Sequence, residues 1–239
     1  MLKFIYKFNL KNTKMKIKNI LIIVIALFIS INSIKSQNTN EMETKILIKT
    51  SMGDITIKLY NETEYHKNNF IKLVNENFYD SLLFHRVIDG FMIQGGDPNS
   101  KDAAPGVALG SGGPGYTIPS ELSPKFYHKK GALAAARTGD QGNPTRRSSG
   151  CQFYLVTGKV YTDTELKILE KRMNTKFTKE QKETYTTIGG TPQLDGQYTV
   201  FGEIISGLEI ADKIAGVQKD KNDRPNENVV IIDMLIIEE

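Results

Sequence analysis

The strongest constraint on the fold is a series of short segments rich in β-branched and aromatic residues, each bounded by turn residues. The first two, at residues 45–49 and 55–59, flank Ser51-Met52-Gly53-Asp54. Because Gly53 can adopt a positive φ there, this pattern predicts a β-hairpin. Further strand-like segments lie at 82–93, interrupted by a turn at Asp89-Gly90, and at 131–136, 152–157, 198–204 and 229–237.

Two helices are expected among these strands. Residues 65–75 place Phe70, Leu73 and Val74 at spacings of three and four, which is typical of an amphipathic helix with one buried face. A second helical stretch lies at 208–214. Many short strands with two framework helices favour a closed β-barrel over alternating βαβ units. Residues 95–124 are dominated by Gly, Pro, Ser and Asp and are expected to form an ordered, irregular loop.

Residues 159–193 form a polar stretch rich in lysine and glutamate. Thr162 with Glu165, and Thr178 with Gln181, have the spacing of capping boxes, so we predict short helices at 163–173 and 179–186. Few large apolar residues occur in this stretch, too few for it to fold alone. We expect a helical excursion that lies on the main domain.

The N-terminal stretch is interpreted as a signal peptide. Residues 1–36 contain seven lysines and no acidic residue, and residues 20–31 form an apolar run. A membrane span needs about 20 apolar residues, so this run is short, and an uncleaved anchor through residues 20–34 stays open. We therefore expect an exported, periplasmic protein with a polar linker at 37–43 and one folded domain at 44–239.

Charge and cysteine content exclude several function classes. Without the seven leader lysines, 24 basic residues face 27 acidic ones, a net charge of −3 that provides no basic surface for nucleic acid. Cys151 is the only cysteine, so no intramolecular disulfide can form. A catalytic thiol needs a base close by, and none is indicated near Cys151, so we interpret it as a packed side chain.

Motifs for other chemistries lack their context. Residues 110–115 match GxGxxG, but the proline within them prevents the helix that would hold a pyrophosphate. No GxSxG elbow of a serine hydrolase occurs. Residues 220–223 lack the glycine and glutamate of a calcium loop and are interpreted as a turn. No metal site is expected, because no common spacing relates His66, His85 and His128.

The remaining candidate is Arg86, within Phe84-His85-Arg86-Val87-Ile88. An arginine on a strand is most often a surface or salt-bridged side chain. Both faces of this strand are apolar, with Phe84 and Ile88 on one and Val87 on the other. Periodicity therefore leaves open which face Arg86 shares.

Four motifs in order resemble those of the cyclophilins. They are FHRVIDGFMIQGGDP at 84–98, GALAAAR at 131–137, GCQFY at 150–154 and LDGQYTVFG at 194–202. The resemblance covers residues 44–239 apart from 160–188. It implies a mainly β fold, a closed eight-stranded antiparallel β-barrel capped by two α-helices, here with a helical insertion at 160–188.

The resemblance also implies a site. Arg86 matches the catalytic arginine of the family. The proline pocket is expected from Phe91, Met92, Tyr154 and Leu194, with Tyr198 at its rim. The peptide backbone is expected to be held by Gln94, Ala136, Arg137 and Gln152, and His85, which we expect to pack or hydrogen-bond locally, completes the predicted substrate-binding set. Tyr154 replaces the usual phenylalanine, Gln193 a common tryptophan and Tyr198 a common histidine.

The implied activity is peptidyl-prolyl cis/trans isomerisation, without metal or cofactor, on proline-containing polypeptides. Rotation about an X-Pro bond makes and breaks no bond, so the reaction needs neither nucleophile nor metal. The other open hypothesis is a binding module or chaperone that holds proline-containing segments in the same groove without turnover. A monomer is expected, since no long apolar surface stripe is visible. The 160–188 insertion is either decoration or a lid or docking surface.

Overall fold

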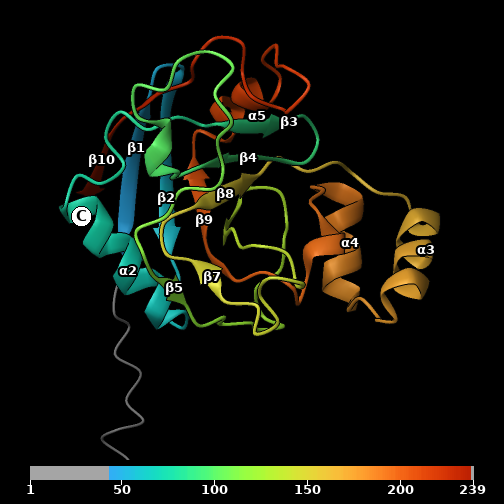
Figure 1. Cartoon of the computed structure of the whole chain (residues 1–239). Helices are drawn as coiled ribbons and strands as arrows, with labels where there is room; N and C mark the ends of the chain where they lie inside the picture. Colours follow the sequence, from blue (N-terminus) through green and yellow to red (C-terminus); the bar gives the residue numbers. More distant parts are fainter. Residues whose placement is uncertain (1–42, 238–239) are drawn as a thin grey trace, which may run out of the picture. The chain divides into compact units, whose positions relative to one another are not determined.

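A computed structural model describes residues 43–237. The predicted signal peptide at 1–36, and the predicted linker apart from Glu43, lie outside the described residues. Within 43–237, no helix has the length and apolarity that crossing a membrane requires. Figure 1 shows the arrangement of the helices and strands.

The described residues form ten strands and four α-helices. The strands are β1 (Lys45–Thr50), β2 (Gly53–Leu59), β3 (Arg86–Ile88), β4 (Met92–Gly95), β5 (Thr117–Ile118), β6 (Ala132–Ala135), β7 (Ser148–Ser149), β8 (Phe153–Val156), β9 (Val200–Ser206) and β10 (Ile231–Ile237). The α-helices are α2 (Glu64–Asn75), α3 (Asp163–Met173), α4 (Lys179–Thr187) and α5 (Leu208–Ala215). Two 3₁₀ turns, η1 (Pro98–Ser100) and η2 (Pro192–Leu194), complete the elements.

The predicted hairpin is confirmed as β1 and β2. Their register pairs Lys45 with Lys58 and Thr50 with Gly53, and Gly53 has a φ of 132°. Buried and less buried residues alternate along both strands, because successive side chains point to opposite faces of a sheet. Ile46, Ile48, Ile55 and Ile57 consequently enter the main core with no exposed surface.

Eight strands form one antiparallel sheet in the order β10-β1-β2-β9-β6-β8-β4-β3. The predicted closed barrel is not confirmed, because β10 and β3 are edge strands of this sheet. The edges approach through an isolated bridge between Leu83 and Val230, flanked by a 2.7 Å hydrogen bond from Ile231 N to Leu82 O. Ser81, with a φ of 66°, places a turn just before this bridge, where an extended strand would be needed for a continuous ladder.

The two framework helices are confirmed as α2 and α5. Helix α2 buries Phe70, Leu73 and Val74, the predicted face, and lies against β10. Helix α5 lies against β2 and β4. Both capping boxes of the 160–188 segment are also present, Thr162 with Glu165 and Thr178 with Gln181. They start α3 and α4, which lie side by side at one flank of the sheet, with α4 nearer to it (Figure 1).

Candidate active site

The strand register brings the candidate residues into one row. Arg86 on β3 pairs with Gln94 on β4, Gln94 pairs with Tyr154 on β8, and Tyr154 pairs with Ala134 on β6. Residues paired across neighbouring strands point to the same face of a sheet. Four segments that span residues 86–154 of the sequence therefore present one line of side chains.

Alternation along the same strands separates this row from the main core. Val87, Ile93 and Phe153 belong to the main core cluster. Met92 and Tyr154, their neighbours in sequence, belong to a second cluster on the other face. This resolves the face of Arg86: it shares its side of β3 with Ile88, which packs against the second cluster.

A pocket of about 110 Å³ opens on this second face. Nine of the eleven predicted site residues line it: Arg86, Phe91, Met92, Gln94, Ala136, Arg137, Tyr154, Leu194 and Tyr198. Its floor is well packed, since Met92 is 2% exposed and Tyr154 is 5% exposed. The pocket thus has the apolar floor and the few polar groups at its border that suit one small, uncharged ring.

Arg86 lies at the pocket with its side chain 43% exposed. Its Nε atom is 3.7 Å from Oδ2 of Asp223, whose Oδ1 atom accepts a 2.8 Å hydrogen bond from Lys219. The turn at 220–223 is anchored to β3, because the backbone N–H of Val87 donates to the Asp223 carbonyl. Sequence reasoning recognised the turn but missed Asp223 as the partner of Arg86. No local signal relates positions so far apart in sequence.

Gln152 lies behind Gln94 rather than in the pocket. Gln94 Nε2 donates to Gln152 Oε1 at 3.0 Å, and Gln152 Nε2 donates to the carbonyls of Gly110 and Gly112 at 3.0 and 2.8 Å. Gln152 therefore orients Gln94, and its own amide is used within the protein. The glycine-rich segment supplies these carbonyls, and Gly112 is required there because an added Cβ would overlap the carboxylate of Asp97.

His85 also lies away from the pocket. It is 4% exposed, and neither ring nitrogen has a hydrogen-bond partner among the described residues. Burial lowers the pKa of His85 to about 4, although the Asp97 carboxylate opposes this shift. His85 therefore packs locally, as expected, and it does not line the pocket. No group of three or more His, Cys, Asp or Glu side chains suited to a metal occurs within residues 43–237.

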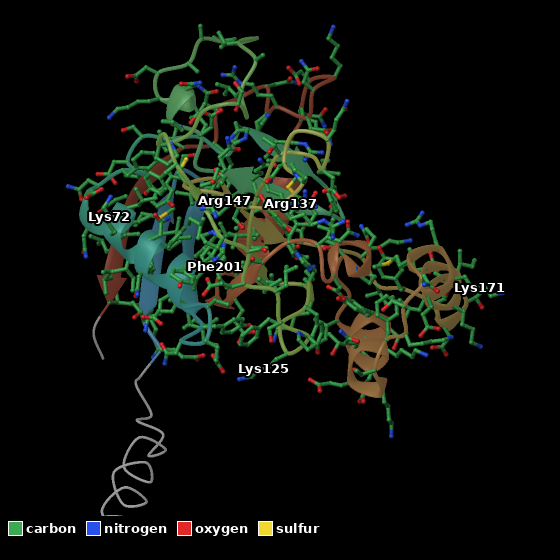
Figure 2. All side chains as sticks on the ribbon, turned by 60° about the horizontal axis from the view of Figure 1, so that its bottom comes forward. Lys72, Lys125, Arg137, Arg147, Lys171 and Phe201 are labelled. Atoms are coloured by element: carbon green, nitrogen blue, oxygen red, sulfur yellow. The ribbon has the colours of Figure 1, made fainter. Side chains whose placement is uncertain are left out.

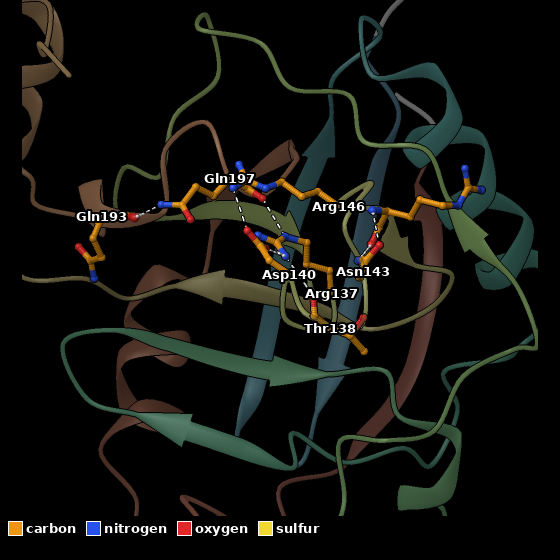
Figure 3. A network of polar contacts seen from close by, with 8 residues as sticks. Arg137, Thr138, Asp140, Asn143, Arg146, Gln193 and Gln197 are labelled. Carbon is orange, nitrogen blue, oxygen red and sulfur yellow. Dashed lines mark hydrogen bonds and ion pairs between the residues drawn. The ribbon is translucent and has the colours of Figure 1, made fainter. Parts of the chain in front are cut away.

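Arg137 closes one side of the pocket and braces the chain after η2. Its guanidinium lies 4.5 Å from the ring centroid of Tyr198, its Nε donates to the Gln197 carbonyl at 2.9 Å, and Nη1 contacts Asp140 at 2.6 Å. Figure 3 shows these contacts continuing from Gln197 to the carbonyl of Gln193. Because these donors bind within the protein, Arg137 shapes the pocket wall more than it offers free donors to a peptide.

A buried hydrogen-bonded chain links α4 to the pocket floor. The Tyr185 hydroxyl donates to Asp195 Oδ2 at 2.6 Å, Asp195 Oδ1 lies 2.9 Å from His128 Nδ1, and His128 Nε2 lies 2.9 Å from the Tyr154 hydroxyl. Burial raises the pKa of Tyr185 and of Tyr154 far above the ordinary value, so both hydroxyls keep their protons. The tyrosine in place of phenylalanine at 154 supplies the hydroxyl that ends this chain. Sequence reasoning did not find it.

Comparisons with known proteins identify the family. The model of the family described as cyclophilin type peptidyl-prolyl cis-trans isomerase/CLD matches residues 45–236. A putative peptidyl-prolyl cis-trans isomerase of Staphylococcus aureus is 33% identical over 200 residues, covering 82% of this chain and 93% of that protein. A putative bifunctional phosphatase/peptidyl-prolyl cis-trans isomerase of Streptococcus pyogenes is 33% identical over 198 residues, and the aligned region spans 38% of its length.

Solved structures show the same fold. A crystal structure of a Cryptosporidium parvum cyclophilin type peptidyl-prolyl cis-trans isomerase superposes with a TM-score of 0.59 at 24% identity, covering 82% of this chain and 99% of that one. A second crystal structure of that protein, obtained in the presence of the dipeptide Ala-Pro, superposes with a TM-score of 0.58 at 23% identity.

Proposed function

This chain belongs to the family of cyclophilin-type peptidyl-prolyl cis-trans isomerases, and we propose that it accelerates rotation about X-Pro bonds with Arg86 as its catalytic residue. The observation that supports this most is the 110 Å³ pocket, whose apolar floor of Met92 and Tyr154 adjoins the Arg86 guanidinium. The related C. parvum protein was crystallised in the presence of Ala-Pro, which is consistent with a proline-containing ligand here.

The proposed reaction requires only that the protein stabilise a rotated peptide bond. An X-Pro bond resists rotation by about 18–20 kcal/mol because rotation breaks amide conjugation. At the twisted transition state the proline nitrogen regains its lone pair, so a fixed donor stabilises that state more than the planar ground state. Arginine suits this role because it stays charged and presents several donors in one plane.

Each wall of the pocket has a part in this proposal. Phe91, Met92, Tyr154 and Leu194 hold the proline ring, so that the preceding acyl group rotates against it. Gln94, oriented by Gln152, is placed to bind the peptide backbone beside the rotating bond. Asp223, 3.7 Å from Nε, limits the freedom of Arg86 without enclosing it and is therefore a positioning residue.

The setting we propose is outside the cytoplasm. The basic start and apolar run of residues 1–36 support export, with the periplasm as the compartment and residues 20–34 as an anchor if the leader is retained. Clients would then be exported polypeptides that expose X-Pro bonds while they fold.

Replacing Arg86 tests the proposal. We expect Arg86→Ala to lower kcat/KM for a short X-Pro peptide about 100-fold or more, the usual scale for removing a transition-state donor. Arg147→Ala is the matched control, because Arg147 bonds Thr117 and does not line the pocket. Thermal melting checks that both variants fold. Near wild-type turnover in Arg86→Ala would contradict the assignment, and peptide binding without acceleration by the wild type would support the binding module.

A further inference from the structure

A second and larger hollow adjoins the proline pocket. It is a groove of about 870 Å³ whose walls are residues 172–178 between α3 and α4, the chain around Phe126 and Tyr127, and Gln193 with residues 195–197. We call it the flanking groove. Its size falls within the range of about 300–1,000 Å³ typical of ligand sites.

The flanking groove and the proline pocket lie on either side of one short segment, residues 193–198. Leu194 and Tyr198 line the pocket, while Gln193 and Gln197 from the same short segment line the groove. A single stretch of chain thus forms the border of both. A polypeptide whose proline occupies the pocket needs only to continue across residues 193–198 to reach the groove.

The charged side chains in the groove are mainly basic. Arg146, Arg172 and Lys176 line it, against one carboxylate, Asp195. Both oxygens of Asp195 already bind inward-facing groups, Tyr185 and His128. Arg146 pairs with Asp140 at 2.8 Å, but both side chains are about half exposed, and such pairs are weak enough to exchange with an acidic ligand. Lys176 lies 3.4 Å from Glu170, but Lys176 is 84% exposed and Glu170 keeps Lys182 as a second partner.

The outer wall of the groove is held in place rather than loosely attached. Tyr185 of α4 donates to Asp195, and the Tyr161 hydroxyl donates to Gln193 Oε1 at 3.2 Å. The turn between α3 and α4 is closed by Glu170, which accepts from Phe177 N and from Lys182, each at 3.0 Å. A wall fixed before binding loses little conformational freedom when a ligand arrives.

We propose that the flanking groove binds the continuation of the substrate polypeptide and selects proline-containing segments that have acidic side chains on one side of the proline. This inference rests on the proposed isomerase function and names its substrate class. The 160–188 segment is then a specificity element, since residues 172–178 supply two of the three basic side chains.

The test compares short and extended substrates with the full chain. A short X-Pro peptide occupies the pocket alone, and longer peptides add six residues before or after the proline, either Glu-rich or Ser-rich. We expect kcat/KM of one Glu-rich peptide to exceed that of its Ser-rich counterpart by about five- to tenfold at low salt, and the difference to shrink at high salt.

Charge-reversal variants assign the effect to the groove. The double variant Arg172→Glu/Lys176→Glu should lose the preference for the Glu-rich peptide and keep wild-type activity on the short one. The matched control is Lys167→Glu/Lys171→Glu, which makes the same charge change on α3 outside the groove. Figure 2 shows Lys171 on the side of α3 remote from Arg137.

The possible results are separable. Equal rates and equal binding of Glu-rich and Ser-rich peptides by the wild type would overturn the inference, as would a preference that survives the double reversal or is lost equally in the control. Failure to isomerise the short peptide would instead overturn the proposed function. In that case fluorescence anisotropy of the labelled peptides still decides the inference, because it measures binding without turnover.

Discussion

The buried hydrogen-bonded chain from α4 to the pocket floor predicts that removing the Tyr185 hydroxyl lowers the free energy of unfolding. In Tyr185→Phe, Asp195 loses a 2.6 Å hydrogen bond inside the protein, where Tyr185 has no exposed surface. A hydrogen bond to a charged group contributes about 1.5–3 kcal/mol. His128 still donates its backbone N–H to Asp195 at 2.8 Å, so the carboxylate keeps a partner, and we expect a loss of about 2 kcal/mol.

Urea unfolding measures this loss directly. With a slope of about 2 kcal/mol per molar urea, a loss of this size lowers the midpoint by about 1 M while the slope is unchanged. The ring of Tyr185 also packs against Tyr161 and Phe177, and phenylalanine preserves that packing. The change in stability therefore reports the hydroxyl.

The matched control is Tyr127→Phe. Its hydroxyl contacts the same helix, 3.0 Å from Thr184 Oγ1, but the contact is only partly buried, so a change within about 0.5 kcal/mol is expected. If Tyr185→Phe were no less stable than this control, the chain would not stabilise the attachment of α4. The outer wall of the flanking groove would then not be fixed before binding, as we infer it to be.

Three further predictions follow from single residues. Burial lowers the pKa of His85 to about 4, below an unfolded value of about 6.5, so the unfolded state binds more protons between these two pH values. Lowering the pH from 7.5 to 5 should therefore reduce the free energy of unfolding by about 2 kcal/mol. Denaturant unfolding of His85→Leu should show a smaller reduction over the same pH range. Burial raises the pKa of Cys151 to about 12, so at pH 8 a thiol reagent should label the native protein far more slowly than the urea-unfolded one. In Gly190→Ala an added Cβ would overlap the His128 carbonyl at a φ of 153°, so thermal melting should reveal a loss of about 3 kcal/mol, whereas Gly139→Ala, with no atom within 4 Å, should melt like the wild type.

Local patterns in the sequence were sufficient to predict helices and strands. Alternation and Gly53 predicted the β1–β2 hairpin, and the two capping boxes predicted the starts of α3 and α4, because these signals depend on residues within a few positions of one another. The ordered motifs likewise identified the family and nine residues that line one pocket. These pocket residues lie within short contiguous segments of the chain, so a motif of a few residues is enough to identify them.

The partners behind those residues required the folded chain. Strand periodicity left the face of Arg86 open, and the register β3-β4-β8-β6 decided it. The contacts of Asp223 with Arg86 and of Asp195 with His128 join positions far apart in sequence, and the Tyr185 hydroxyl reaches Asp195 from the end of a different element. Such contacts depend on how turns and edges bring distant segments together, and no short-range pattern encodes that. The same reason explains the edge strands: a run of strands predicts a sheet, while its closure depends on whether the two edge strands, β3 and β10, pair with each other.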